Sequence, residues 1–65
     1  MMILRFMTKR DRNGNRRYLA IDTEKKMFTT LCWHMIPDGE EVTTKTIRNI
    51  RSACENAGYI ETEAF

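Results

Sequence analysis

The sequence predicts an α+β domain in which a three-stranded antiparallel β-meander is followed by one C-terminal helix packed on one face. Three observations support this order. Two alternating segments flank Asn13-Gly14, a run of β-forming residues covers 27–36, and apolar residues with helical spacing follow Thr43. A chain of 65 residues can build only one small hydrophobic core, so residues 1–65 are expected to form a single domain.

The first two strands are predicted from the alternation on either side of Asn13-Gly14. This pair is favoured in type I′ hairpin turns, because both central positions of such a turn need a positive φ. A two-residue turn here fixes a register in which two cross-strand pairs match in charge: Asp11 with Arg16, and Arg5 with Asp22. The same register gathers four apolar residues on one face: Leu4, Phe6, Leu19 and Ile21.

The run from Met27 to Ile36 is rich in β-forming residues and predicts a third antiparallel strand. Which of its faces is buried is ambiguous, because both faces carry apolar residues. One face would hold Phe28, Cys32 and Ile36, and the other Met27, Leu31, Trp33 and Met35. Either a bulge switches the facing midway along the strand, or a partner covers part of the second face.

A helix is predicted over about 44–57, beginning after the capping pair Thr43-Thr44 and ending at Gly58. Its apolar stripe recurs at helical spacing and is expected to pack on the apolar face of the hairpin: Ile47, Ile50, Cys54 and Ala57. The segment from Tyr59 to Phe65 alternates weakly, which makes a short fourth strand an option there.

Charge is the most unevenly distributed property of the chain. Residues 9–17 carry a net charge of +4, whereas residues 18–65 carry −3. Because Lys and Arg displace counterions from nucleic acid, a basic hairpin of this kind can contact phosphates. The residues of this predicted DNA- or RNA-binding surface are Lys9, Arg10, Arg12, Arg16 and Arg17. The alternative is a solvated turn whose charges discourage edge pairing.

A second basic surface is predicted on the helix, away from its apolar stripe, and consists of Lys45, Arg48 and Arg51. These residues can assist the hairpin, or they can be ordinary exposed helix residues, with Arg51 paired to Glu55 one turn on. In topology alone, a three-stranded sheet backed by one helix resembles DNA-reading modules of the integrase arm-site-binding and AP2 type. That resemblance implies contact with the major groove through the sheet.

The apolar residues of the third strand offer a different function. Leu31, Trp33 and Met35 would form an exposed apolar sheet face, and Trp and Met are frequent anchors at protein interfaces. The alternative function is therefore a small protein-binding or inhibitory factor of the phage or mobile-element type, with a homodimer as one form of it. If a bulge is present, these side chains belong to the core instead.

Enzymatic function is not expected, because the sequence contains no glycine-rich phosphate loop, paired-carboxylate signature or nucleophile elbow. Cys32 and His34 share a strand face, but a zinc site would need further ligands at a recognisable spacing. We expect no metal, cofactor or small-molecule substrate. Two cysteines, the lack of a signal peptide and the lack of a long apolar run predict a cytoplasmic protein with reduced thiols and no membrane contact.

Overall fold

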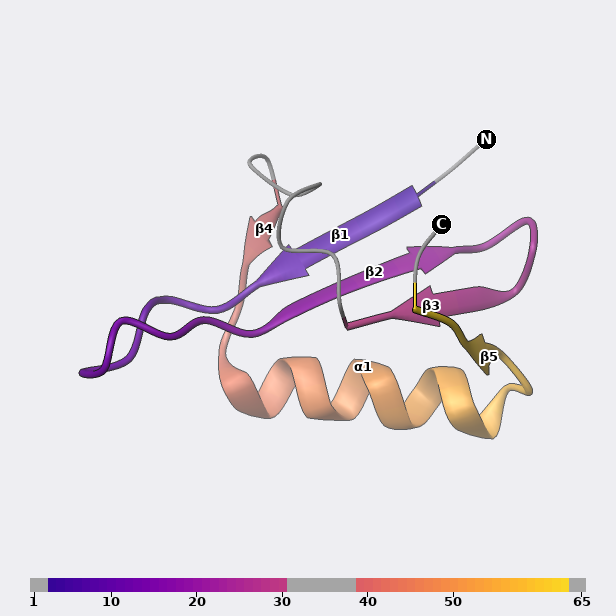
Figure 1. Ribbon diagram of the computed structural model, residues 1–65. Coiled ribbons are helices and arrows are strands. Elements are labelled where there is room, and N and C mark those ends of the chain that lie inside the picture. Colours follow the sequence, from indigo (N-terminus) through magenta and orange to yellow (C-terminus); the bar gives the residue numbers. More distant parts are fainter. Residues whose placement is uncertain (1–2, 31–38, 64–65) are drawn as a thin grey trace.

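The computed structural model describes residues 3–30 and 39–63, which form a five-stranded mixed sheet with one helix on one of its faces (Figure 1). The strand order across the sheet is β4-β1-β2-β3-β5. The elements in chain order are β1 (Ile3–Met7), β2 (Tyr18–Asp22), β3 (Met27–Thr29), β4 (Glu40–Glu41), α1 (Thr44–Asn56) and β5 (Ile60–Glu61). The predicted α+β class, the meander and the C-terminal helix are confirmed, and the sheet is wider than predicted.

The meander β1-β2-β3 is antiparallel, as the sequence predicts, but the register of its first hairpin differs by two residues. Arg5 pairs with Ala20 and Ile3 with Asp22, so the predicted pair of Arg5 with Asp22 is wrong. The reason lies in the turn and in the segment just before it, which together use two more residues than the predicted type I′ hairpin. A shift of two residues preserves the facing of every side chain, and the predicted apolar face survives it.

Asp22 has a structural function at the end of β2. Its side chain is buried, and its Oδ1 atom accepts hydrogen bonds from the backbone amides of Glu24 and Lys25, both at 3.0 Å. This arrangement closes the tight turn into β3, in which Lys26 adopts a φ of 55°. The Asp22 carboxylate accepts hydrogen bonds from backbone amides of the turn, and these take the place of the predicted cross-strand contact with Arg5.

The two outer strands are two residues long, and each pairs in parallel with the meander. β4 pairs with Phe6 and Met7 of β1, and β5 pairs with Met27 and Phe28 of β3. The short strand expected after the helix is therefore confirmed as β5, whereas β4 was not predicted. Because α1 lies between β4 and β5 in the chain, one helix connects the two opposite edges of the sheet (Figure 1).

Helix α1 begins and ends as the sequence predicts. Thr43 is the N-cap, and its side-chain oxygen accepts a hydrogen bond from the Thr46 amide at 3.1 Å. At the other end, the amide of Tyr59 donates to the Cys54 carbonyl and the amide of Gly58 to the Glu55 carbonyl. Gly58 has a φ of 85°, which completes a Schellman motif and turns the chain into β5.

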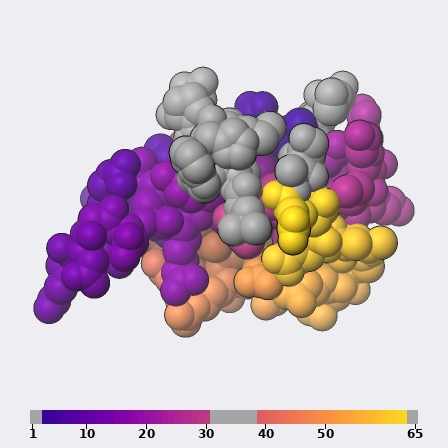
Figure 2. All heavy atoms as spheres, viewed as in Figure 1, coloured from indigo at the N-terminus to yellow at the C-terminus, as the bar shows by residue number. Residues whose placement is uncertain are grey.

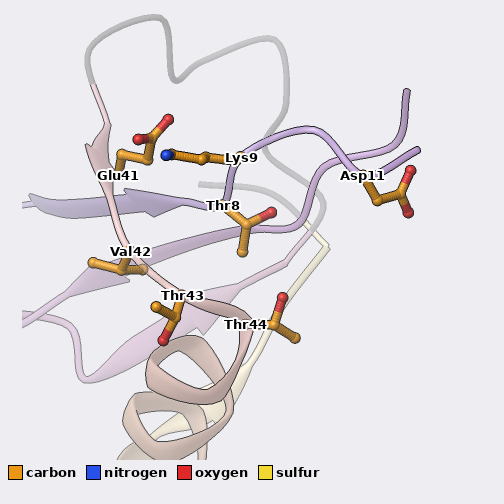
Figure 3. A pocket seen from close by; sticks show the side chains of 7 residues that line it. All are labelled: Thr8, Lys9, Asp11, Glu41, Val42, Thr43 and Thr44. Atoms are coloured by element: carbon orange, nitrogen blue, oxygen red, sulfur yellow. The ribbon is translucent and has the colours of Figure 1, made fainter. Parts of the chain in front are cut away.

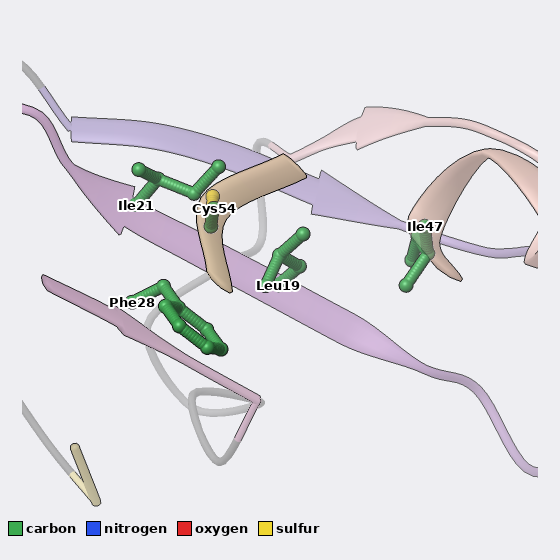
Figure 4. Close-up of a cluster of buried hydrophobic side chains, with 5 residues drawn as sticks. All are labelled: Leu19, Ile21, Phe28, Ile47 and Cys54. Carbon is green, nitrogen blue, oxygen red and sulfur yellow. The ribbon is translucent and has the colours of Figure 1, made fainter. Parts of the chain in front are cut away.

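The core lies between the sheet and α1 (Figure 4). Leu19 and Phe28 are the most deeply buried apolar side chains, at 0% and 1% exposure. Leu19 lies on the central strand, where neighbouring strands cover both sides of it. The cluster consists of Leu19, Ile21, Phe28, Ile47 and Cys54, with Phe6, Val42, Ile50 and Tyr59 packed around it. The predicted contact between the helix stripe and the hairpin face is thereby confirmed, except that Leu4 and Ala57, which were predicted to be part of it, are exposed.

Burial raises the pKa of the Cys54 thiol, and the neighbouring Glu55 carboxylate raises it further. The folded state therefore retains the thiol proton to higher pH than the unfolded chain, in which a cysteine has a pKa of about 8.5. We expect the free energy of unfolding to be insensitive to this group below that pH, and to fall as the pH rises through it toward the folded-state pKa.

Urea denaturation at pH 7 and pH 9.5 measures this effect, with Cys54→Ala as the control. The loss of stability between the two pH values should be larger in the wild-type chain than in the variant. Equal losses in both chains would show that the Cys54 thiol does not link folding to pH.

Candidate functional site

The most prominent surface feature is a two-stranded arm, defined here as residues 8–17, which extends β1 and β2 beyond the end of the core. In Figures 1 and 2 it projects to the left of the body, past the start of α1. The amide of Thr8 donates to the Arg17 carbonyl at 3.0 Å, and the amide of Asp11 donates to the Asn15 carbonyl at 2.8 Å. Backbone hydrogen bonds thus join the two sides of the arm both at its root and next to its tip.

The tip of the arm is a β-turn from Asp11 to Gly14, closed by a 2.9 Å hydrogen bond from the Gly14 amide to the Asp11 carbonyl. Gly14 has a φ of 80°, whereas Asn13 does not adopt a positive φ. This geometry is typical of a loop in which a left-handed glycine follows an ordinary turn, so the predicted type I′ turn is wrong. The longer loop accounts for one residue of the shift, because it opposes Asp11 to Asn15. The other residue is gained between Asp11 and Thr8, since Thr8 is opposed to Arg17.

Asp11, the single acidic residue of the arm, stabilises this turn. Its Oδ1 atom accepts hydrogen bonds from the backbone amides of Asn13 at 2.8 Å and Asn15 at 2.9 Å. The predicted pairing of Asp11 with Arg16 does not occur. The carboxylate is engaged by the backbone, and the arginines around it are left without that counterion.

Thr8 fixes the root of the arm and was not singled out by sequence reasoning. It is buried at 5% exposure, and its Oγ1 atom accepts a hydrogen bond from the Arg17 amide at 3.0 Å. The same pair of residues is joined by the backbone bond from the Thr8 amide, so two hydrogen bonds link the strands where the arm leaves the core. The sequence contained one signal for this function: Thr8 is a polar residue that directly follows the alternating segment of the first strand.

Basic side chains lie on both faces of the arm. Arg16 lies on the face away from the helix, where its Nη1 atom contacts the Met7 sulfur at 3.6 Å. Arg17 is the next residue along the strand, and it borders a hollow together with Ile47 and Arg48 of α1. Alternation along a strand puts neighbouring side chains on opposite faces, so the ribbon is cationic on both.

The charges of the arm are not neutralised by nearby acids. Within residues 3–30 and 39–63, no cation of the arm has a carboxylate within 4 Å, whereas Arg51 of α1 contacts Glu61 at 2.9 Å and Glu55 at 3.8 Å. Arg10 instead donates to the Gly14 carbonyl at 3.0 Å. The arm therefore presents cations whose counterions must come from solvent or from a ligand.

The basic residues of α1 divide into two groups. Lys45 and Arg48 are exposed, and neither has a carboxylate within 4 Å among the described residues. Arg51 is held by Glu61 of β5 in addition to the Glu55 that the sequence suggested. Its positive charge is largely offset, which makes it a weaker candidate for contact with an anion than the other two.

A hollow of about 470 Å³ separates the root of the arm from the start of α1 (Figure 3). Lys9 points toward Glu41 across it, and Thr8 from the arm and Thr44 from the first turn of α1 also line it. This hollow leaves the root of the arm accessible on its flank. Because Glu41 lines this hollow, it is less favourable for an anion than the surface beside Arg17 and Arg48, which no unpaired carboxylate borders among the described residues.

Other predicted residues fall outside the part of the chain that the structure describes. These are the proposed protein-interface residues Leu31, Trp33 and Met35, together with the pair Cys32 and His34. In the described ranges, no three His, Cys, Asp or Glu side chains lie close enough together to hold a metal ion. The described part likewise contains no helix that is long and apolar enough to cross a membrane.

Comparison of the chain with protein-family models, with curated proteins and with solved structures gave no match. The functional argument therefore rests on the geometry and charge of the arm and of the adjoining helix.

Proposed function

We propose that this protein is a non-enzymatic nucleic-acid-binding module that inserts its basic arm into the major groove of duplex DNA. The observation that carries the proposal is the arm itself, a hydrogen-bonded ribbon with cations on both faces and without carboxylate partners. The contact residues are Lys9, Arg10, Arg12, Arg16 and Arg17, assisted by Lys45 and Arg48 of α1.

The dimensions of the arm favour a duplex. The major groove of B-form DNA is about 12 Å wide and admits a two-stranded β-ribbon. Adjacent strands lie about 4.8 Å apart, so a ribbon with side chains on both faces fits between the two phosphate backbones. The deep, narrow major groove of an RNA duplex excludes such a ribbon, which is why DNA is the proposed ligand.

Fluorescence anisotropy with labelled nucleic acids tests this function. The wild-type protein should bind a mixed-sequence DNA duplex at 50 mM salt, and its affinity should fall roughly 10³-fold at 200 mM salt if about six phosphates are contacted. An RNA duplex of the same sequence should bind more weakly. The absence of DNA binding at 50 mM salt would refute the proposed function, and equal affinity for both duplexes would refute insertion into the major groove.

A protein partner is the second candidate function, and one feature of the described residues favours it. Leu4 is 39% exposed and borders an apolar groove of about 270 Å³ together with Ile50 and Ala53 of α1. On the other face of the sheet, Ile60 is 68% exposed. Light scattering on the sample used for the DNA titration distinguishes the two functions, because a dimer that does not bind DNA would favour this one.

A further inference from the structure

A second hollow, of about 250 Å³, lies on the helix side of the arm root, where β2 and α1 approach each other. Two exposed arginines border it, Arg17 from the arm and Arg48 from the second turn of the helix. The remaining lining residues are Tyr18, Thr30, Ile47 and Arg51. Two arginines that lie far apart in the sequence therefore border the same small concave surface.

The charges around this hollow are unbalanced within the part of the chain that the structure describes. Arg51 is paired with Glu61 at 2.9 Å and with Glu55 at 3.8 Å. These two acids are therefore engaged, and neither Arg17 nor Arg48 has a carboxylate within 4 Å among the described residues. Like charges that face one hollow repel each other, so an anion bound between them would be stabilised by both.

We propose that this hollow binds one phosphate group of the DNA backbone, with Arg17 and Arg48 as its ligands. The planar guanidinium group suits this function, because it donates two parallel hydrogen bonds to phosphate oxygens. The Thr30 hydroxyl can donate a further hydrogen bond. The volume lies below the roughly 300 Å³ at which small-molecule pockets begin, which fits a phosphate better than a larger substrate.

The phosphate is a DNA phosphate only if the proposed function is correct. In that case the hollow attaches the protein to DNA at a second point, in addition to the arm. The arm alone could rotate or slide within a groove, because it contacts DNA along a single ribbon. A phosphate held between Arg17 and Arg48 would fix α1 against the backbone that borders the groove. Contacts of this kind position a protein on DNA and carry no sequence preference of their own.

Arg48→Gln is the decisive variant, since Arg48 lies outside the arm and outside the core. In a DNA titration across several salt concentrations, its salt slope should be about one unit shallower than that of the wild type. The affinity loss should be the same for every duplex sequence. Lys25→Gln is the matched control, because Lys25 is an exposed cation in the β2–β3 turn, at the opposite end of the sheet (Figure 1).

An NMR titration with pyrophosphate tests the hollow without DNA. We expect shifts at the amides of Arg17, Thr30 and Arg48, and their loss in Arg48→Gln. Such shifts in a protein that fails to bind DNA would support the phosphate site and refute the proposed function. DNA binding with the same salt slope in Arg48→Gln and Lys25→Gln, and without pyrophosphate shifts at these amides, would refute the phosphate site and leave the arm as the DNA-binding element.

Discussion

Replacing the four cations Lys9, Arg10, Arg12 and Arg16 by glutamine is expected to weaken DNA binding roughly 10³-fold at 100 mM salt, because each phosphate contact contributes about 0.9 to the salt slope. The fold should persist, since none of these side chains belongs to the hydrophobic core. The substitutions remove one contact with the Met7 sulfur and one with the Gly14 carbonyl. Fluorescence anisotropy measures the affinity, and circular dichroism confirms the fold.

A charge-conserving variant is the matched control for this prediction. Exchanging Lys for Arg and Arg for Lys at the same four positions keeps the positive charge while altering hydrogen-bond geometry. Its salt slope should stay close to the wild-type value, since that slope counts neutralised phosphates. If the glutamine variant bound DNA as tightly as this control, the arm would not be the DNA-binding element.

The substitution Asp11→Asn is expected to raise the affinity for DNA instead of lowering it. The amide oxygen can still accept the hydrogen bonds from Asn13 and Asn15, so the turn should be retained. Removing the negative charge from the tip should strengthen DNA binding, because it removes repulsion between the tip and the phosphates. Weaker binding by a correctly folded Asp11→Asn protein would contradict insertion of the arm.

Leu19→Ala is expected to lower the free energy of unfolding by about 2–5 kcal/mol, because it opens a cavity at a fully buried position on the central strand. A chain of this length is stabilised by only roughly 3–10 kcal/mol. The substitution therefore removes a large share of the stability, and the urea midpoint of the variant should fall well below that of the wild type. Urea denaturation followed by circular dichroism measures the loss.

Leu4→Ala is the matched control for Leu19→Ala. It is the same substitution on the same face of the sheet, but Leu4 is 39% exposed. Less of its side chain leaves water on folding, so the stability loss should be well below that of Leu19→Ala. Equal losses would show that the core is not centred on β2.

The helix was predictable because each of its signals is local. Thr43 caps it, Gly58 ends it, and Ile47 and Cys54 face the sheet as their spacing predicts. The facing of the hairpin was predictable for the same reason. Its register was not, because Asn13-Gly14 is compatible with more than one turn, and the outcome depends on the hydrogen bonds that the Asp11 side chain makes.

The outer strands show a different limit of sequence reasoning. β4 consists of Glu40 and Glu41, which carry no alternation and little preference for a strand. It forms because α1 places this part of the chain beside β1, and such long-range placement leaves no local pattern. The ion pair between Arg51 and Glu61 follows from the position of β5 in the same way. The hollow that Arg17 and Arg48 border likewise depends on how α1 lies against β2, and no local pattern in the sequence predicts it.

The connection of both sheet edges through α1 has a consequence for local unfolding. β4 precedes the helix and β5 follows it, so each edge of the meander is covered by a strand attached to the same helix. Detachment of α1 would uncover the unpaired backbone groups of β1 and β3 in a single event. Exposed strand edges are templates for pairing with other chains, and docking of the helix thus protects the protein against aggregation at both edges together.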